Sequence, residues 1–125
     1  MSKPRTLVRT RPKVSLLDFS REQVLAYLRE KLAGRGVVAA YLFGSFAEGT
    51  HGAWSDLDVV IVKPTREHPV ERPREFHDLT DLGVPVDVLV YTPEEFKRLE
   101  LEPTGFWKEF ARTRVAVLEA ATGGR

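Results

Sequence analysis

Three acidic residues of this chain stand where carboxylates are rarely placed unless they bind something. Asp56 and Asp58 open the apolar run 59–62, and Asp87 lies inside a second apolar run, 84–90. Residues i and i+2 share one face of a strand, so Asp56 and Asp58 should project together while Leu57 points the other way. Such a pair suits Mg²⁺, a hard ion that carboxylates and substrate phosphates hold.

Gly44 and Ser45 form a second candidate group. Ten residues lie between Ser45 and Asp56. They end the apolar run 37–43, so they should form a strand-to-helix turn whose backbone N–H groups can face an anion. Gly44 would let the backbone approach a phosphate, and the Ser45 hydroxyl could donate to one. Ser45 could equally be a helix N-cap. Ser55, directly before Asp56, is a third candidate nucleotide contact or a cap that orients the Asp56 loop.

Helices and strands alternate along the predicted chain. Ser20 and Gln23 form a capping box at the start of a helix. Thr92 and Pro93 are the N-cap and first residue of another. The other predicted elements are strands at 37–43, 59–62, 84–90 and 115–118, a helical turn at 46–48, a helix at 72–82 and a short helix around residues 106–110. The order predicts an α/β (α+β) fold with helices beside a mixed sheet.

The joint pattern of Gly-Ser, ten residues, Asp-x-Asp and a later strand Asp resembles the DNA polymerase beta-like nucleotidyltransferase superfamily, and within it the minimal nucleotidyltransferases. Its motifs run from about residue 37 to residue 90. The resemblance implies a nucleotidyltransferase palm core, with the carboxylates on the central strands.

The resemblance also implies roles for individual residues. Asp56 and Asp58 would bridge two Mg²⁺ ions, and Asp87 would hold the catalytic ion and accept or orient the proton of the attacking hydroxyl. Two metal ions about 3.5–4 Å apart can stabilise both the attacking and the leaving oxygens. Gly44, Ser45 and Ser55 would bind the nucleotide, with ATP as the donor of AMP.

The chain departs from the pattern of many relatives at Glu48, where they carry Arg or Lys. Glu48 would repel a triphosphate if it pointed inward. Either it faces solvent, or nucleotide affinity is reduced, or a cation comes from elsewhere, with Lys63, Arg66 and the basic N-terminal segment as candidates.

Several other residues have less certain roles. Trp54 could stack on a base or cover its loop. The three histidines, His51, His68 and His77, share no metal-ligand spacing and are expected at the surface. Phe106, Trp107 and Phe110 are expected in the core, with a partner surface as the alternative.

Length and charge indicate one domain with a basic extension. The 125 residues suffice for a single core. Residues 1–13 hold five basic side chains and no acidic one, and two prolines interrupt the start. We therefore expect a flexible basic arm at 1–15, which could bind phosphate or a partner, and a single nucleotidyltransferase domain at 16–125.

Composition suggests where the protein works. There is no apolar run of 18 residues, no secretory signal pattern and no cysteine, so we expect a cytoplasmic protein without a membrane span. The sequence has no Asn, one Gln, eight prolines and 13 Arg against six Lys. This profile favours a thermophile, although a GC-rich genome would give similar Arg and Pro usage.

Two classes of function follow. In the first, the chain transfers AMP to a hydroxyl of a partner protein. Members without a second domain resemble antitoxins paired with a small helical HEPN-type ribonuclease toxin. An aminoglycoside-like small molecule is a further possible acceptor, whereas direct nucleic-acid synthesis is not expected. In the second class, the same fold is a neutralising or regulatory subunit with little or no catalysis, a reading that Glu48 favours.

Overall fold

A computed structural model of the chain describes residues 12–119. Within this range the chain alternates between helical segments and four strands, as predicted. In chain order the elements are η2 (Leu16–Asp18), α1 (Arg21–Leu32), β1 (Ala39–Phe43), α2 (Gly44–Glu48), β2 (Leu57–Val62), η3 (Arg72–Leu82), β3 (Val86–Tyr91), α3 (Pro93–Leu99), α4 (Gly105–Thr113) and β4 (Val115–Glu119).

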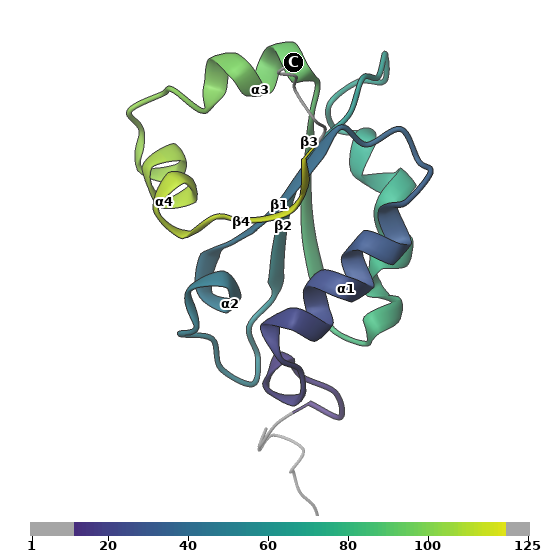
Figure 1. Ribbon diagram of the computed structural model, residues 1–125, viewed down its shortest axis with the longest axis vertical. Coiled ribbons are helices and arrows are strands. Elements are labelled where there is room, and N and C mark those ends of the chain that lie inside the picture. The colour runs from purple at the N-terminus through teal and green to yellow at the C-terminus, as the bar shows by residue number, and fades with distance from the viewer. Residues whose placement is uncertain (1–11, 120–125) are drawn as a thin grey trace, which may run out of the picture.

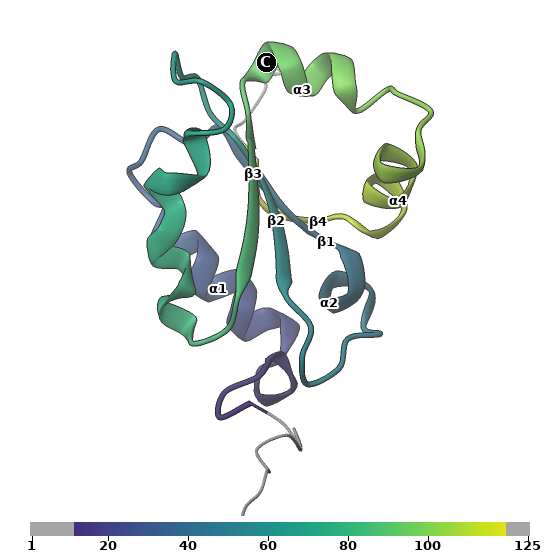
Figure 2. The same ribbon diagram turned by 180° about the vertical axis from the view of Figure 1, so that it is seen from behind.

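The four strands form one mixed sheet in the order β3-β2-β1-β4. β1 is antiparallel to both β2 and β4, and β2 is parallel to β3. Figures 1 and 2 show α1 and η3 on one face of this sheet, and α3 and α4 on the other. The predicted fold class, a mixed sheet with flanking helices, is confirmed.

Strand alternation divides the core into two clusters, one on each face of the sheet. On β2, Leu57, Val59 and Ile61 belong to the cluster under α1 and η3. Val60 and Val62 belong to the second cluster, with Trp107 and Phe110 of α4. Because side chains alternate along a strand, Asp58 lies on the α4 face with Val60 and Val62.

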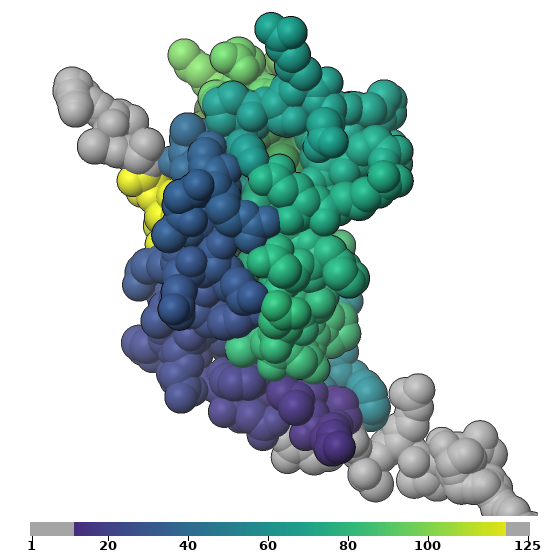
Figure 3. Space-filling model, turned by 90° about the vertical axis from the view of Figure 1, so that its right-hand side faces the viewer, coloured from purple at the N-terminus to yellow at the C-terminus, as the bar shows by residue number. Residues whose placement is uncertain are grey.

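Polar contacts fasten α1 to η3 on the first face. The Tyr27 hydroxyl donates to the carbonyl of Leu79 at 2.7 Å, and Arg35, in the turn that follows α1, forms an ion pair with Asp78 at 2.9 Å. Figure 3 faces this layer and shows the two segments lying against each other along the molecule. No helix within residues 12–119 is long and apolar enough to cross a membrane.

The predicted capping box of Ser20 is present, and Thr92 is the N-cap of α3 as predicted. The predicted helix at 72–82 differs from expectation, because it is built of 3₁₀ turns with a break at Phe76, whose φ and ψ are −108° and 17°. The Phe76 ring is buried in the core, so this break keeps an apolar anchor under the sheet.

The packed part of the chain begins before residue 16, the predicted start of the domain. Ser15 is buried and caps η2 through its hydroxyl, and Val14 packs against the first core cluster. Val14 and Ser15 therefore pack with the residues that follow them. Residues 1–11, which make up most of the predicted arm, lie outside the described residues.

Candidate active site

Two of the three predicted carboxylates lie side by side on neighbouring strands. β2 and β3 are parallel, and their register places Asp58 directly opposite Asp87. Paired residues of adjacent strands project from the same face of a sheet. Asp56 directly precedes β2, which begins at Leu57 rather than at Asp56 as expected.

The three acidic side chains act on one another electrostatically. Asp58 is half-buried, whereas Asp56 and Asp87 are exposed. Burial, followed by the negative charges of Asp87 and Asp56, raises the pKa of Asp58 to about 6. A cation between these groups would relieve the repulsion that disfavours the ionised form of Asp58.

The donor chemistry of this end of the sheet suits a magnesium ion. Within residues 12–119, no group of three or more His, Cys, Asp or Glu side chains is arranged to hold a metal ion by itself. Mg²⁺, however, is commonly bound by one or two carboxylates together with the phosphates of a substrate. Asp58 and Asp87 provide two such carboxylates on one face, with Asp56 beside them.

Gly44 packs directly on Asp58, so the Gly-Ser turn and the carboxylates form one site. Gly44 begins α2 with a φ of +79°, a left-handed conformation that favours glycine. A β-carbon added to Gly44 would lie 2.5 Å from Oδ2 of Asp58. Both the conformation and this close approach therefore require glycine here.

The backbone amide of Gly44, at the start of the turn, has a partner within the protein. It donates to the Thr113 hydroxyl at 2.9 Å, and this hydroxyl donates to the Glu109 carbonyl at 2.9 Å. Because α2 has only five residues, its dipole is also small. The Ser45 side chain is half-buried next to this turn and makes no hydrogen bond within the described residues.

Glu48 is paired with a cation from α4. Arg112 binds it through two hydrogen bonds, Nη1 to Oε2 at 3.0 Å and Nη2 to Oε1 at 3.2 Å. This contact lowers the pKa of Glu48. No local pattern predicts this pairing, because the partners are 64 positions apart along the chain. Glu48 is therefore neither directed freely into solvent nor left uncompensated.

The cations that we had considered from the sequence lie elsewhere. Lys63 follows the far end of β2 and pairs with Glu75. Lys63 is five positions after Asp58, about 16 Å away at the rise of an extended chain. Arg66 is exposed in the loop beyond Lys63. Neither residue borders the carboxylates.

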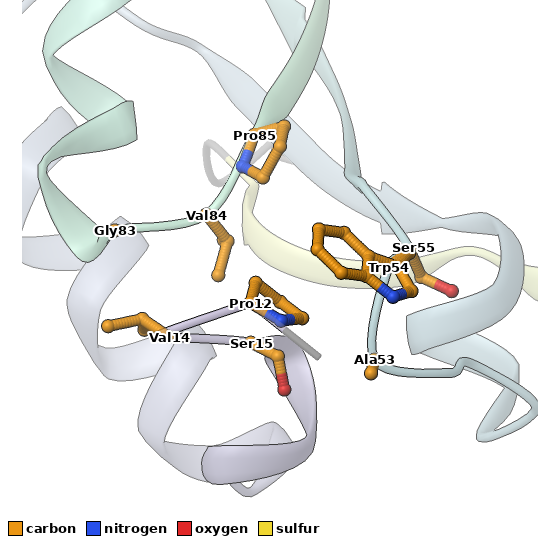
Figure 4. Close-up of a pocket in the computed structure, with 9 residues that line it drawn as sticks. All are labelled: Pro12, Val14, Ser15, Ala53, Trp54, Ser55, Gly83, Val84 and Pro85. Atoms are coloured by element: carbon orange, nitrogen blue, oxygen red, sulfur yellow. The ribbon is translucent and has the colours of Figure 1, made fainter. Parts of the chain in front are cut away.

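A largely apolar pocket of about 150 Å³ lies between the start of the described chain and the loops that lead into β2 and β3. Figure 4 shows the Trp54 ring on one side of this pocket, and Val14 and Val84 on the other. Trp54 lines the pocket and is 53% exposed. Ser55 accepts a hydrogen bond from the Gly52 amide at 2.9 Å, which closes the loop just before Asp56.

The remaining candidates divide between core and surface. Trp107 and Phe110 are buried as expected, whereas Phe106 is 41% exposed. His68 and His77 are exposed. His51 differs from the prediction, because its ring packs 4.7 Å from that of Phe46 and its Nδ1 is buried without a hydrogen-bond partner in the described part of the chain.

Comparison with solved structures shows the same fold in other proteins. Among solved structures, a minimal nucleotidyltransferase is 25% identical, with a TM-score of 0.53, over 82% of this chain and 96% of that one. A toxin–antitoxin complex with AMP-PNP is 18% identical, with a TM-score of 0.54, over 82% and 76% of the two chains. The toxin–antitoxin pair MntA–HepT is 14% identical, with a TM-score of 0.52, over 80% and 74%.

No curated protein matches the sequence. The profile of the Nucleotidyltransferase domain family, by contrast, matches residues 21–121, which include every predicted site residue. The chain therefore belongs to the nucleotidyltransferase domain family.

Proposed function

We propose that this protein transfers AMP from ATP to a hydroxyl group of a partner protein, with Asp56, Asp58 and Asp87 at the reacting centre. The observation that carries the proposal is the pairing of Asp58 with Asp87 across parallel strands, with Gly44 packed on the Asp58 carboxylate. Three acids at one end of a sheet need a cationic partner, and a metal-bound triphosphate supplies one.

The reaction forms one bond and breaks one at the α-phosphorus. The acceptor oxygen bonds to the α-phosphorus, the bond to the bridging oxygen breaks, and pyrophosphate leaves with the electron pair. Asp87, exposed on the edge strand, accepts the proton of the acceptor hydroxyl. Two Mg²⁺ ions, when bound to the three carboxylates, supply charge stabilisation for the attacking and leaving oxygens.

Residues around the carboxylates orient the nucleotide. Gly44 leaves room beside Asp58 because it has no side chain. The Ser45 hydroxyl donates to a phosphate oxygen, and Ser55 fixes the loop that carries Asp56 through its bond to Gly52.

A small helical protein of the HEPN toxin type is the proposed acceptor, with this chain as its antitoxin. The support is the likeness in fold to toxin–antitoxin complexes, one of them with AMP-PNP, and to a minimal nucleotidyltransferase. The acceptor would be a Tyr, Ser or Thr hydroxyl, and a folded protein can position that hydroxyl through its own docking surface.

A neutralising subunit without catalysis is the second candidate from the sequence. Its only specific support was the negative charge of Glu48. Arg112 compensates that charge, so the argument from repulsion loses its force. A small-molecule acceptor stays an alternative that the same assay distinguishes.

The proposal is tested by intact-mass spectrometry of the product of the neighbouring gene, after incubation with this protein, ATP and Mg²⁺. We expect a mass gain of one or more AMP groups with the wild type and none with Asp58→Asn or Asp87→Asn. Modification of an aminoglycoside with no mass gain on the protein would overturn the choice of acceptor. No transfer to either would favour the neutralising subunit.

A further inference from the structure

Arg112, in the last turn of α4, is held by two carboxylates at once. Besides its two bonds to Glu48, it donates to Glu109 from Nη2 at 2.6 Å and from Nε at 3.2 Å. The Arg112 side chain is nevertheless 56% exposed. Exposed ion pairs contribute little to stability, from about zero to 1 kcal/mol. Stabilisation of the fold therefore does not account for this double pairing of Arg112.

The guanidinium lies beside the proposed nucleotide site. Thr113, the next residue, receives the hydrogen bond of the Gly44 amide. A rise of 1.5 Å per residue places Glu48 about 6 Å along α2 from Gly44. α4 also covers the sheet face on which Asp58 and Asp87 project, because its Trp107 and Phe110 pack with Val60 and Val62.

A triphosphate at this site needs a cation that α2 does not provide. α2 is short, the Gly44 amide is taken, and Glu48 carries a negative charge. Arg21 also reaches α2, where it donates to the Ala47 carbonyl at 2.7 Å, but it comes from α1 on the opposite face of the sheet. Arg112 approaches from the face of the carboxylates.

We propose that Arg112 binds the β- and γ-phosphates of the nucleotide and leaves Glu48 when it does so. The inference rests on the proposed nucleotidyl transfer at Asp58 and Asp87. A guanidinium can form two parallel hydrogen bonds to a phosphate as it does to a carboxylate. Glu48 and Glu109 hold the side chain ordered in the free protein, and the phosphates replace Glu48 as its acceptor.

Binding constants for ligands with different numbers of phosphates test the role. We would measure Kd for a non-hydrolysable ATP analogue and for AMP, each with Mg²⁺, by titration calorimetry. Arg112→Gln should weaken binding of the ATP analogue about tenfold or more and leave AMP binding unchanged, since hydrogen bonds to charged groups are strong. Arg112→Lys should restore part of the affinity.

Two further variants separate this role from general charge effects. Glu48→Gln removes the competing carboxylate, so it should tighten binding of the ATP analogue several-fold and leave AMP binding unchanged. Lys108→Gln removes the same charge one helical turn earlier on α4, from an exposed residue, and should leave both Kd values unchanged.

Equal losses for AMP and the ATP analogue in Arg112→Gln would indicate a structural role and overturn the inference. It would also be overturned by unchanged binding of the analogue, by no binding to the wild type, or by an equal loss in Lys108→Gln. The proposed function fails independently: Arg112-dependent binding of the analogue without any transfer would contradict transfer and support this phosphate contact.

Discussion

At the residue scale, the site depends on how closely Gly44 approaches Asp58. The glycine brings the backbone against the carboxylate, and Asp87 on β3 lies opposite the same carboxylate. Asp58 is therefore enclosed by backbone on one side and by negative charge on another. This explains the raised pKa of Asp58. It also predicts that repulsion among the three carboxylates destabilises the folded protein when no metal is bound.

Replacing Asp58 with Asn should separate activity from stability. We expect Asp58→Asn to abolish nucleotidyl transfer, because it removes a metal-binding carboxylate. It should raise the free energy of unfolding by about 1 kcal/mol in metal-free buffer at pH 8, since a repelled charge is removed. Urea denaturation with a chelator measures the second effect. Near wild-type transfer in the variant would contradict the site assignment.

Gly44→Ala should lose both stability and transfer. A left-handed backbone costs a non-glycine residue about 1–2 kcal/mol, and the added carbon would also displace the Asp58 carboxylate. Gly49→Ala is the matched control, since Gly49 ends the same helix at a φ of +90° but has no atom within 4 Å of an added β-carbon. Urea denaturation and the transfer assay should show equal backbone costs and a loss of transfer in Gly44→Ala alone.

At the element scale, Arg72 joins three elements from a buried position. Its guanidinium pairs with Glu95 of α3 at 2.7 Å and donates to the Val90 carbonyl of β3 at 3.2 Å and to the Glu67 carbonyl at 2.9 Å. These contacts hold η3 and α3 around the edge strand that carries Asp87. The same sheet edge thus depends on one buried ion pair.

Arg72→Met should destabilise the fold by about 3 kcal/mol, because it leaves Glu95 and two carbonyls without their donor. Arg74→Met is a suitable control, since Arg74 is 81% exposed and its pair with Glu71 lies on the surface. Its effect should stay below about 0.5 kcal/mol. Comparable midpoints of urea denaturation for the two variants would show that the buried pair contributes nothing special.

The same ion pair should give stability a pH dependence. The hydrogen bond from Arg72 lowers the pKa of Glu95 below its ordinary value. A depressed carboxyl pKa contributes stability above the unfolded-state value, near 4.3, and this contribution disappears as pH falls through the folded-state value. The difference in unfolding free energy between wild type and Glu95→Gln should therefore be present at pH 7 and shrink below about pH 4. A difference that does not change with pH would contradict this linkage.

At the scale of the whole molecule, the composition and the surface ion pairs both favour high thermal stability. Asn and Cys are absent, and Lys31 of α1 and Arg35 of the turn that follows it form a network of ion pairs with Asp78 and Asp81 of η3. Networks of this kind stabilise proteins mainly at high temperature.

We therefore expect a cooperative thermal melt above about 75 °C by differential scanning calorimetry, beyond the usual mesophile range of 45–65 °C. Asp78→Asn breaks the network and should lower the midpoint of the thermal melt. Glu71→Gln removes a surface ion pair with Arg74, three positions away, and should leave the midpoint unchanged. A wild-type midpoint near 50 °C would contradict this expectation. Genomic base composition alone would then explain the absence of Asn and Cys.

The sequence by itself determined whatever depends on local spacing. Strand alternation and helix caps are short-range effects, so the strands, the N-caps Ser20 and Thr92 and the mixed sheet followed from the printed residues. The motif around Asp56 and Asp58, with Asp87, likewise indicated one family, to which the chain belongs. The roles of these acids stay a prediction.

Only the tertiary structure decided which distant groups meet. The Thr113 hydroxyl on the Gly44 amide and the Arg112 pair with Glu48 join residues 69 and 64 positions apart, and no periodicity reports such contacts. The break at Phe76 arose in the same way, because burial of one ring against the sheet prevailed over regular helix. Charge compensation and packing act through space, so they appear only when the chain has folded.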